Sequence, residues 1–337
     1  MSSVSVVMPV RDRPSLTAGS LDRFLAEYGD EDGVEVVVVD DGSEGEARRL
    51  LERYADRVTV VGHARPRGFA AASNEGAAAA DGEYVIFLNN DTMSTPGWLH
   101  ALVEFAERVP HAVAVGAKLL YTNDTVQHAG IVICHDGLPR HVYRGFSGDH
   151  PLVSVPRRFH AVTAACMLVR RDSFEAVGGF DTAFVNGFED VDLCLRFAEH
   201  GEVHYCPDSV LYHLEAATRG DLPESPGEFA ANAALYRERW GHVTPDDLSV
   251  YVADGLLDVT YGDLYPMPFR VSPEVGELSA EPTPTEAYRL LNVRARQVFE
   301  LLRENAMLRV RLGELERRAL REAVAPERPV DVPVSPA

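Results

Sequence analysis

Short apolar runs alternate with amphipathic stretches through the first half of the chain, which is the pattern of repeated strand and helix units. The apolar runs are rich in valine, and turn residues such as Gly and Asp follow them. Residues 84–88 are apolar throughout, which is typical of a strand buried on both faces of a parallel sheet. We expect strands at residues 4–10, 34–43, 57–62 and 84–88, and helices at residues 15–28, 44–55 and 68–82.

The second half begins with a helix and continues with longer apolar runs. Thr95 is expected to be the N-cap of the helix, with Pro96 in its first turn. A further helix is expected from Glu189 to Gly201, which would end it as a C-terminal glycine. The apolar runs expected to be strands are residues 112–121, 126–133 and 160–171. Together the two halves predict an α/β fold, followed at residues 221–285 by an irregular or helical extension that wraps the core.

A heptad pattern of apolar residues marks residues 286–323. With Val298 as position a, apolar residues fall on alternating d and a positions for about three heptads. Asn305 occupies an a position, where a lone Asn fixes the register of parallel dimers, so we expect this segment to form a coiled-coil homodimer. The alternative is a helix that packs on its own domain. Residues 324–337 are expected to be disordered.

Composition and charge narrow the classes of partner. The chain has 337 residues, a net charge of −20 and a pI near 5.0. An acidic protein repels nucleic acid and anionic membranes, so neither is expected as the main partner. No apolar run approaches the roughly 18 to 20 residues that span a bilayer, and the N-terminus lacks the pattern of a signal peptide. We therefore expect a cytoplasmic protein with no transmembrane segment, peripheral attachment to a membrane being left open.

The cysteines show no spacing that indicates chemistry. None of them forms a CxxC pair, and all lie in apolar segments. Structural zinc sites and redox pairs need such spacing, so we expect reduced core residues rather than disulfides or metal ligands. The four residues are Cys134, Cys166, Cys194 and Cys206.

Candidate residues lie at or just after the carboxyl ends of three expected strands, and this is the edge of an open α/β sheet where ligands bind. An Arg there can meet a phosphate, a carboxylate can accept hydrogen bonds from a base or ribose, and an oxygen-rich turn suits Mg²⁺ or Mn²⁺. The alternative is that these acids and amides only cap helices and turns. The residues are Pro9 and Arg11, then Asp40 and Asp41, then Asn89, Asn90 and Asp91.

Two later segments carry further candidate chemistry. Glu189 and Asp190 open an expected helix, where the helix dipole favours acids on structural grounds alone. The same dipole keeps a carboxylate ionised, and an ionised carboxylate at the mouth of a pocket can take a proton from a hydroxyl group. His213 follows an apolar run and is either a satisfied core histidine or a ligand; Thr218 and Arg219 nearby are groups that bind phosphate.

Six blocks, VVMPVRDR, VVVVDDGS, GFAAASNEGAAAADGEYVIFLNNDT, TAACMLVRRDSFEAVGGFDTAF, GFEDVDLCLRF and VLYHLEAATRG, resemble glycosyltransferase family 2. They occur in the family's order over about residues 3–220. The resemblance implies the GT-A fold, a Rossmann-like mixed sheet flanked by helices, for residues 1–220. It also implies a hexosyltransferase that inverts the anomeric centre. The form of the GGFD and FEDVDLCLR blocks is most similar to rhamnosyl and related transferases of surface polysaccharide or natural-product pathways.

The resemblance assigns roles to individual residues. Asp190 would be the general base, with Glu189 orienting it or touching the acceptor, and Asp91 would ligate the metal. His213 would join the metal or diphosphate site, and Arg219 would meet the charge of the leaving group. Asn89 stands where a strict DxD motif has its first Asp, so the motif departs from the family's pattern there. The residues implied to hold or shape the nucleotide pocket are Pro9, Arg11, Asp40, Asp41, Arg65, Gly68, Asn74, Asn89 and Asn90.

The predicted reaction moves a sugar from a dTDP-, UDP- or GDP-linked donor to a hydroxyl of a glycan, a lipid-linked or a small-molecule acceptor, with Mg²⁺ or Mn²⁺. A loop at residues 137–158, with Arg140, Arg144, Arg157 and Arg158, is the candidate for closing over the donor; the arginines could instead meet an anionic acceptor or lie on the surface. A sugar-phosphate nucleotidyltransferase is disfavoured because a Gly-rich loop after the first strand is missing. The alternative in another class is a catalytically inactive, nucleotide-binding scaffold that dimerises through its C-terminal helix.

Overall fold

A ten-stranded mixed sheet forms the centre of the described part of the chain, which comprises residues 2–214, 226–259 and 269–275 of this computed structural model. The strands of this sheet are β1 (Val4–Val10), β2 (Val34–Asp40), β3 (Thr59–Gly62), β4 (Tyr84–Leu88), β5 (Thr92–Ser94), β6 (Ala112–Leu120), β7 (Val126–His128), β10 (Arg157–Phe159), β11 (Cys166–Arg170) and β12 (Glu202–His213). Two hairpins stand apart from it, namely β8 (Ile131–Ile133) with β9 (Pro139–His141), and β13 (Leu257–Val259) with β14 (Phe269–Val271).

The described residues belong to one unit of the chain, Met1–Asn292. The expected coiled-coil helix at 286–323, with its Asn305, and the expected tail at 324–337 lie outside the described residues. Dimerisation through that helix therefore stays a prediction.

The order of the strands confirms the expected strand and helix units and the mixed sheet. It runs β10-β12-β6-β11-β4-β1-β2-β3, with β5 on β12 and β7 on β6. β1 pairs in parallel with β2 and with β4, and β2 pairs in parallel with β3. β11 lies antiparallel between β4 and β6. The carboxyl ends of β1, β2, β3 and β4 therefore meet at one edge of the sheet, where the candidate residues of the first half were expected.

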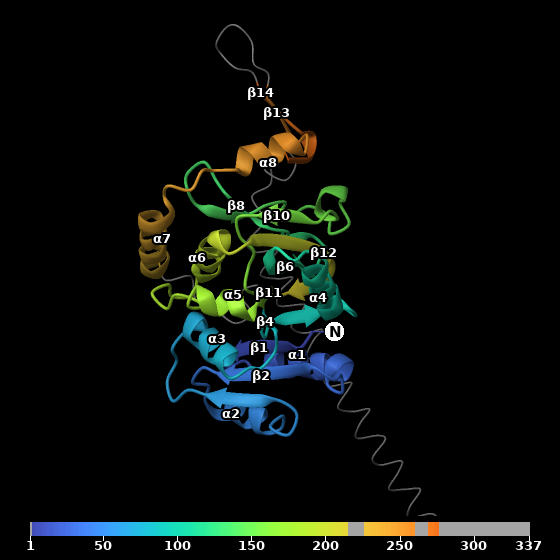
Figure 1. Cartoon of the computed structure of the whole chain (residues 1–337), viewed down its shortest axis with the longest axis vertical. Coiled ribbons are helices and arrows are strands. Elements are labelled where there is room, and N and C mark those ends of the chain that lie inside the picture. Colours follow the sequence, from blue (N-terminus) through green and yellow to red (C-terminus); the bar gives the residue numbers. More distant parts are fainter. Residues whose placement is uncertain (1, 215–225, 260–268, 276–337) are drawn as a thin grey trace, which may run out of the picture. The chain divides into compact units, whose positions relative to one another are not determined.

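Helices cover both faces of the sheet. Figure 1 shows α3, α5 and α6 along one side and α1 and α4 along the other. Leu21, Phe24 and Trp98 are buried on the face of the sheet that α1 and α4 cover. Phe174 and Leu193 are buried on the face that α3, α5 and α6 cover. Among the described helices, none has the length and apolar character needed to cross a bilayer. The helices are α1 (Pro14–Tyr28), α2 (Gly45–Glu52), α3 (Phe69–Ala78), α4 (Trp98–Arg108), α5 (Arg171–Ala176), α6 (Glu189–Arg196), α7 (Pro226–Trp240) and α8 (Asp247–Ala253).

The start of α4 differs from the expectation. The helix begins at Trp98, and the residue before it is Gly97 in the left-handed conformation, with φ of 78°. Thr95 is not its N-cap, because the Thr95 hydroxyl donates to the carbonyl of Val210 at 2.7 Å. That bond ties the end of β5 to β12, so a contact between distant segments outweighs the local preference of Thr for the cap.

The apolar run at 126–133 forms two strands rather than the expected single strand. β7 ends at His128 and β8 begins at Ile131, with Gly130 between them at φ of +118°. A Cβ at position 130 would lie 2.3 Å from the ring of Phe159, so a side chain would collide as well as strain the backbone. The run expected at 160–171 is also shorter as a strand, since only Cys166–Arg170 forms β11.

The cysteines carry free thiols, as the sequence predicts. Cys166, Cys194 and Cys206 are buried, and Cys134 is half-buried. Burial raises the pKa of the Cys194 thiol to about 12, which keeps this thiol protonated at physiological pH. They therefore serve as small apolar residues of the core.

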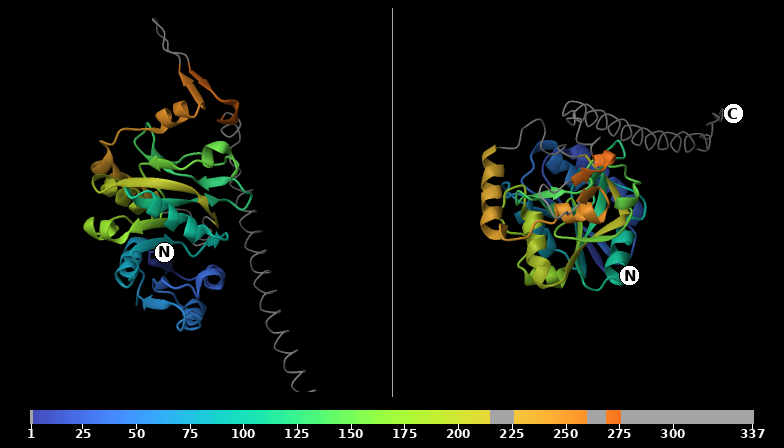
Figure 2. Two further views of the ribbon diagram at one scale, coloured as in Figure 1. Left: turned by 45° about the vertical axis from the view of Figure 1, so that its right-hand side comes forward. Right: turned by 90° about the horizontal axis from the view of Figure 1, so that it is seen from above.

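Helix α7, from the segment that follows the expected GT-A region, contacts α6 through a buried carboxylate. The side chain of Asp192 is fully buried and accepts hydrogen bonds from Arg196 Nε at 2.8 Å, Arg239 Nη1 at 3.2 Å and Trp240 Nε1 at 2.9 Å. Figure 2 shows α7 beside α6, in agreement with these contacts. The ion pair between Asp192 and Arg196 is therefore one part of a larger network.

Replacing Asp192 should strongly destabilise the protein. Asp192→Ala removes the acceptor of Arg196 Nε, of one Arg239 contact and of the indole N–H of Trp240, and breaking a buried ion pair costs about 3 kcal/mol or more. Arg196 keeps its hydrogen bond to the carbonyl of Val177, and Arg239 keeps its ion pair with Asp181. Urea unfolding measures this cost. Asp172→Ala, at the exposed first turn of α5, is the matched control and should change stability by about 0.5 kcal/mol at most. A similar loss in both variants would show that the network contributes little.

Candidate active site

The end of β4 and the end of β12 bring Asp91 and His213 together. β5 pairs with β12 so that Thr92 lies opposite His213, and the backbone N–H of Leu214 donates to the carbonyl of Asp91 at 3.0 Å. Asp91 is only 3% exposed. His213 Nε2 lies 3.1 Å from Asp91 Oδ1, although 122 residues separate them in the chain. The structure thus unites two of the residues singled out in the sequence.

Two amides lie beside the His213 ring. Nδ1 of His213 lies 2.7 Å from Oε1 of Gln127, so Nδ1 can donate its proton to that oxygen. On the other side of the ring, Nδ2 of Asn89 lies 3.4 Å from Nε2. An oxygen acceptor facing Nδ1 and an amide donor facing Nε2 both favour the tautomer with the proton on Nδ1. The lone pair of Nε2 then points toward Asp91.

The Asp91 and His213 pair fits a divalent metal ion. Two neighbouring ligands of an octahedral ion, each at about 2.1 Å, lie about 3.0 Å apart, and the observed separation of the ligand atoms is 3.1 Å. Within the described residues there is no group of three or more His, Cys, Asp or Glu side chains that could hold a metal. A divalent ion bound here would have Asp91 and His213 as its protein ligands and would take its other ligands from water or substrate phosphates.

Asp190 lies at the start of α6, where its carboxylate accepts backbone hydrogen bonds. Oδ1 accepts from the N–H of Val191 at 2.9 Å and Oδ2 from the N–H of Ala164 at 3.2 Å. Burial raises the pKa of the Asp190 carboxyl above its ordinary 3.8, and the hydrogen bonds from Ala164, Thr163 and Val191 partly offset that rise. A carboxylate with a raised pKa is a better proton acceptor than an exposed one.

Two consecutive residues, Ala164 and Ala165, connect Asp190 with the pair formed by Asp91 and His213. Ala164 donates to Asp190, and the carbonyl of Ala165 accepts from the N–H of Asn89 at 3.0 Å. Asn89 is in turn beside His213. The carboxylate of α6 and the pair at the ends of β4 and β12 are therefore held against the same short stretch of chain, just before β11.

The loop before α6 has an unusual backbone that α7 holds in place. Asn186, Gly187 and Phe188 all have positive φ, at 52°, 151° and 73°. Positive φ in bulky non-glycine residues costs energy and is concentrated at functional sites. Asn232 of α7 is buried, and its amide bonds to Val185 and Gly187: Nδ2 donates to the carbonyls of Val185 at 2.8 Å and Gly187 at 3.1 Å, and Oδ1 accepts from the N–H of Val185 at 3.2 Å. Glu189, also buried, accepts from the N–H of Gly187.

Asp41 is fully engaged with its neighbours at the ends of β2 and β3. Its Oδ1 accepts from His63 Nδ1 at 2.7 Å and from the N–H of Arg67 at 2.7 Å, and Oδ2 accepts from the N–H of Gly68 at 2.9 Å. Asp40 Oδ1 accepts from the N–H of Ser43 at 2.8 Å. Both carboxylates thus shape the turns at this edge, and their expected contact with a nucleoside stays a prediction.

The other residues expected in the nucleotide pocket fall into two groups. Asn74 and Asn90 make internal hydrogen bonds: Asn74 pairs with the backbone of Phe180 at 2.8 Å in both directions, and Asn90 donates to Thr17 at 2.9 Å. Arg11 and Arg65 have exposed side chains, Pro9 is half-buried in β1, and Gly68 precedes α3 at φ of 88°. Arg219 and Thr218 lie outside the described residues.

The loop at 137–158, expected to close over the donor, is packed against its surroundings. Val142, Tyr143, Phe146 and Val153 are buried in a cluster with β7 and β12. Three of its four arginines are paired with carboxylates: Arg140 with Asp136, Arg157 with Asp254 and Arg158 with Glu202. The guanidinium of Arg144 lies over the ring of Tyr121. Closure of this loop and contact with an anionic acceptor stay predictions.

Three residues of the site escaped the sequence analysis. Gln127 is a buried partner of His213, His63 links Asp41 to Glu75, and Asn232 holds the loop before α6. A polar Gln-His pair inside the apolar run 126–133 was a signal for Gln127. Asn232 lies in a helix with no motif around it, so the sequence offered no signal.

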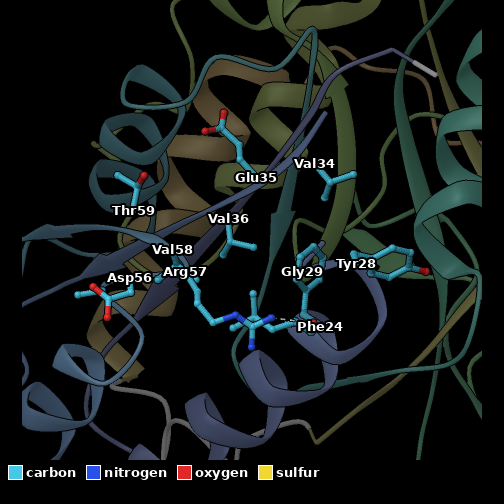
Figure 3. A pocket seen from close by; sticks show the side chains of 12 residues that line it. Phe24, Tyr28, Gly29, Val34, Glu35, Val36, Asp56, Arg57, Val58 and Thr59 are labelled. Atoms are coloured by element: carbon cyan, nitrogen blue, oxygen red, sulfur yellow. Dashed lines mark hydrogen bonds between the residues drawn. The ribbon is translucent and has the colours of Figure 1, made fainter. Parts of the chain in front are cut away.

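A surface pocket of about 300 Å³ lies away from all these residues (Figure 3). It is lined by the end of α1, the start of β2 and residues 55–59 before and at β3. Arg57 enters it and donates to the carbonyl of Leu25 at 3.1 Å. The pocket contains none of the candidate site residues and lies at the amino ends of the strands, so it is not the candidate active site.

Comparisons with known proteins point to one family. The family model described as glycosyl transferase family 2 matches residues 5–178. The O-antigen biosynthesis protein RfbC of Myxococcus xanthus is 35% identical over 69% of this chain. The N-acetylglucosaminyl-diphospho-decaprenol L-rhamnosyltransferase of Mycobacterium tuberculosis is 29% identical over 61% of this chain and 75% of its own length. The chain spans 19% of the length of the Myxococcus protein.

A solved structure supports the fold. The mannosyltransferase PcManGT from Pyrobaculum calidifontis, in complex with GDP-Man and Mn²⁺, superposes with a TM-score of 0.50 over 87% of this chain and 86% of its own. At 19% sequence identity this similarity concerns the fold alone. The mixed sheet flanked by helices is the arrangement of the GT-A fold that the sequence predicts.

Proposed function

Since this chain belongs to glycosyltransferase family 2 and is a glycosyltransferase, we propose that it moves a sugar from a nucleoside-diphosphate donor to an acceptor hydroxyl with inversion. The observation that carries the proposal is the 3.1 Å approach of His213 Nε2 to Asp91 Oδ1, with Asp190 held against the same segment at Ala164 and Ala165. A metal ligand pair and a proton acceptor are the parts that such a transfer needs.

Asp190 acts as the general base in the proposed reaction. Its carboxylate takes the proton of the acceptor O–H while the acceptor oxygen forms a bond to the anomeric carbon. The bond between that carbon and the diphosphate oxygen breaks, and its electron pair leaves with the nucleoside diphosphate. Attack from the face opposite the leaving group inverts the anomeric centre.

Asp91 and His213 would hold the metal in this proposal. The Mg²⁺ or Mn²⁺ would supply positive charge to stabilise the leaving diphosphate. The Asn89 amide and the Gln127 amide orient the His213 ring. Pro9, Arg11, Asp40, Asp41, Arg65 and Gly68 lie at or beside the carboxyl ends of β1, β2 and β3 and would hold or shape the nucleotide pocket.

The acceptor and the donor are proposed from relatives. The names of the two relatives refer to O-antigen biosynthesis and to a rhamnosyl transfer onto N-acetylglucosaminyl-diphospho-decaprenol. We therefore place this enzyme among transferases that build surface polysaccharide or related glycans, with a dTDP-, UDP- or GDP-sugar as donor. An inactive scaffold is less favoured, because Asp91, Asp190 and His213 are all present and lie at one edge of the sheet.

A panel of nucleotides tests the proposal. Thermal unfolding of the wild-type protein is measured with UDP, dTDP, GDP, ADP or CMP, each with and without Mn²⁺. One nucleoside diphosphate should raise the melting temperature only in the presence of Mn²⁺, because a ligand that binds the native state alone stabilises it by about 2.7 kcal/mol at a hundred times its dissociation constant. No response to any nucleotide would contradict the proposed nucleotide-sugar donor.

A further inference from the structure

Gln127 lies on β7 at a point where the pairing with β6 is irregular. His128 lies opposite Leu119 and Val126 opposite Leu120, so Gln127 is an extra residue on β7 between two paired positions. This is a β-bulge, and bulges near functional sites redirect a side chain from the regular alternation of the strand. The side chain that this bulge redirects is only 5% exposed and reaches His213.

We propose that Gln127 is a positioning residue that holds His213 in the tautomer able to bind the metal. The inference rests on the proposed function, because it concerns the same Asp91 and His213 site. Gln127 Oε1 accepts the Nδ1 proton of His213 at 2.7 Å, which leaves the lone pair of Nε2 directed to Asp91 Oδ1 at 3.1 Å. A histidine ligand whose other ring N–H is fixed by an acceptor binds its metal more tightly.

The neighbouring groups show why such a residue is needed. The carboxylate of Asp91 favours a proton on Nε2, since an Nε2–H could donate to Oδ1. That tautomer would place a proton where the metal has to bind. Gln127 at Nδ1 and the Asn89 amide at Nε2 both favour the opposite tautomer. Gln127 and Asp91 thus favour opposite tautomers of His213, with the ring proton on Nδ1 and on Nε2 respectively.

Substitutions at Gln127 separate this role from a structural one. Gln127→Leu removes the acceptor and keeps most of the volume, so His213 should turn to the Nε2–H tautomer and Mn²⁺ affinity should fall about 10- to 100-fold. Gln127→Glu keeps an acceptor at Nδ1 and should retain the affinity. Thr95→Val, which deletes the hydrogen bond to Val210 of β12 without touching the ring, controls for loosening of that strand.

Two measurements decide the inference. Electron paramagnetic resonance follows free Mn²⁺ during titration of the full chain with UDP, dTDP or GDP present in separate experiments. The ring ¹⁵N chemical shifts of His213 in histidine-labelled, metal-free protein, at a pH of about 8.5, report the tautomer directly. We expect the Nδ1–H form in the wild type and in Gln127→Glu, and the Nε2–H form in Gln127→Leu, the latter with weakened Mn²⁺ binding.

The outcomes distinguish the inference from the proposed function. Mn²⁺ binding that Asp91→Ala removes and Gln127→Leu leaves unchanged would overturn the role of Gln127 alone. An unchanged tautomer in Gln127→Leu would do the same. A wild-type protein that binds no Mn²⁺ with any of the three nucleotides would contradict the metal-assisted transfer itself, and the role of Gln127 with it.

Discussion

Asp190→Asn is expected to lower glycosyl transfer by about 10²- to 10⁴-fold while nucleotide binding persists. The substitution keeps the size of the side chain and removes the only proton acceptor proposed at the acceptor hydroxyl. Turnover is measured as nucleoside diphosphate released from the donor that the nucleotide panel identifies, with simple glycosides as acceptors. The melting temperature with that nucleotide and Mn²⁺ reports binding. Asp172→Asn, at the exposed first turn of α5, is the matched control and should keep full turnover.

The pH dependence of the wild-type enzyme follows from the same carboxylate. Because burial raises the pKa of Asp190, the carboxyl is protonated and inactive up to a higher pH than an exposed aspartate would be. The acid limb of the pH–rate profile should therefore lie above the ordinary pKa of 3.8. A limb at or below 3.8 would show that another group is the base.

Asp190→Asn should also change how the stability of the protein depends on pH. A carboxyl whose pKa is higher in the folded than in the unfolded state stabilises the fold fully below its unfolded pKa, and this contribution is lost as the pH rises through the folded pKa. At about pH 7 the buried charge is therefore a cost that Asn does not carry. The amide nitrogen of Asn cannot accept one of the two backbone hydrogen bonds, from Ala164 or Val191, and this cost does not depend on pH. The melting temperature of Asp190→Asn relative to that of the wild type should therefore rise from about pH 4 to about pH 7. Lower turnover with a relative stability that rises with pH is the behaviour expected of a buried catalytic carboxylate.

The first half of the fold could be predicted because its information is local. Each of β1, β2 and β4 is an apolar run followed by turn residues, and each intervening helix has its own periodicity. The parallel order of these strands then follows from short crossover helices. The break at Gly130 could not be predicted in this way, because it depends on the ring of Phe159, which packs there from a distant segment.

The candidate site could be predicted only in part, because it also depends on contacts between distant segments of the chain. Asp91 and His213 are recognisable through the motifs around them, but the 122 residues between them leave no local signal that they meet. Gln127 depends on a bulge, and a bulge is a property of the pairing between β6 and β7 rather than of β7 alone. Asn232 reaches the loop before α6 from a helix that carries no motif. Contacts made across the fold are thus the part that sequence patterns miss.

Asp91→Asn is expected to abolish the Mn²⁺-dependent part of nucleotide binding. The amide keeps the shape of the side chain and loses the negative charge that a hard divalent ion prefers. If the wild type gains about 2.7 kcal/mol from nucleotide and Mn²⁺ at a hundred times the dissociation constant, the variant should lose most of that gain. Any stabilisation by the nucleotide without metal should persist, because the residues expected at the nucleoside lie at the ends of β1, β2 and β3.

The control for Asp91→Asn is Asp208→Asn, an exposed carboxylate on the same strand as His213. It removes the same charge from the protein without touching the pair, so its response to Mn²⁺ should equal that of the wild type. A variant at position 91 that keeps the full Mn²⁺-dependent shift would mean that the 3.1 Å approach to His213 serves the fold and not the metal. If only Asp91→Asn loses the Mn²⁺-dependent rise in melting temperature, the Asp91 carboxylate couples metal binding to nucleotide binding.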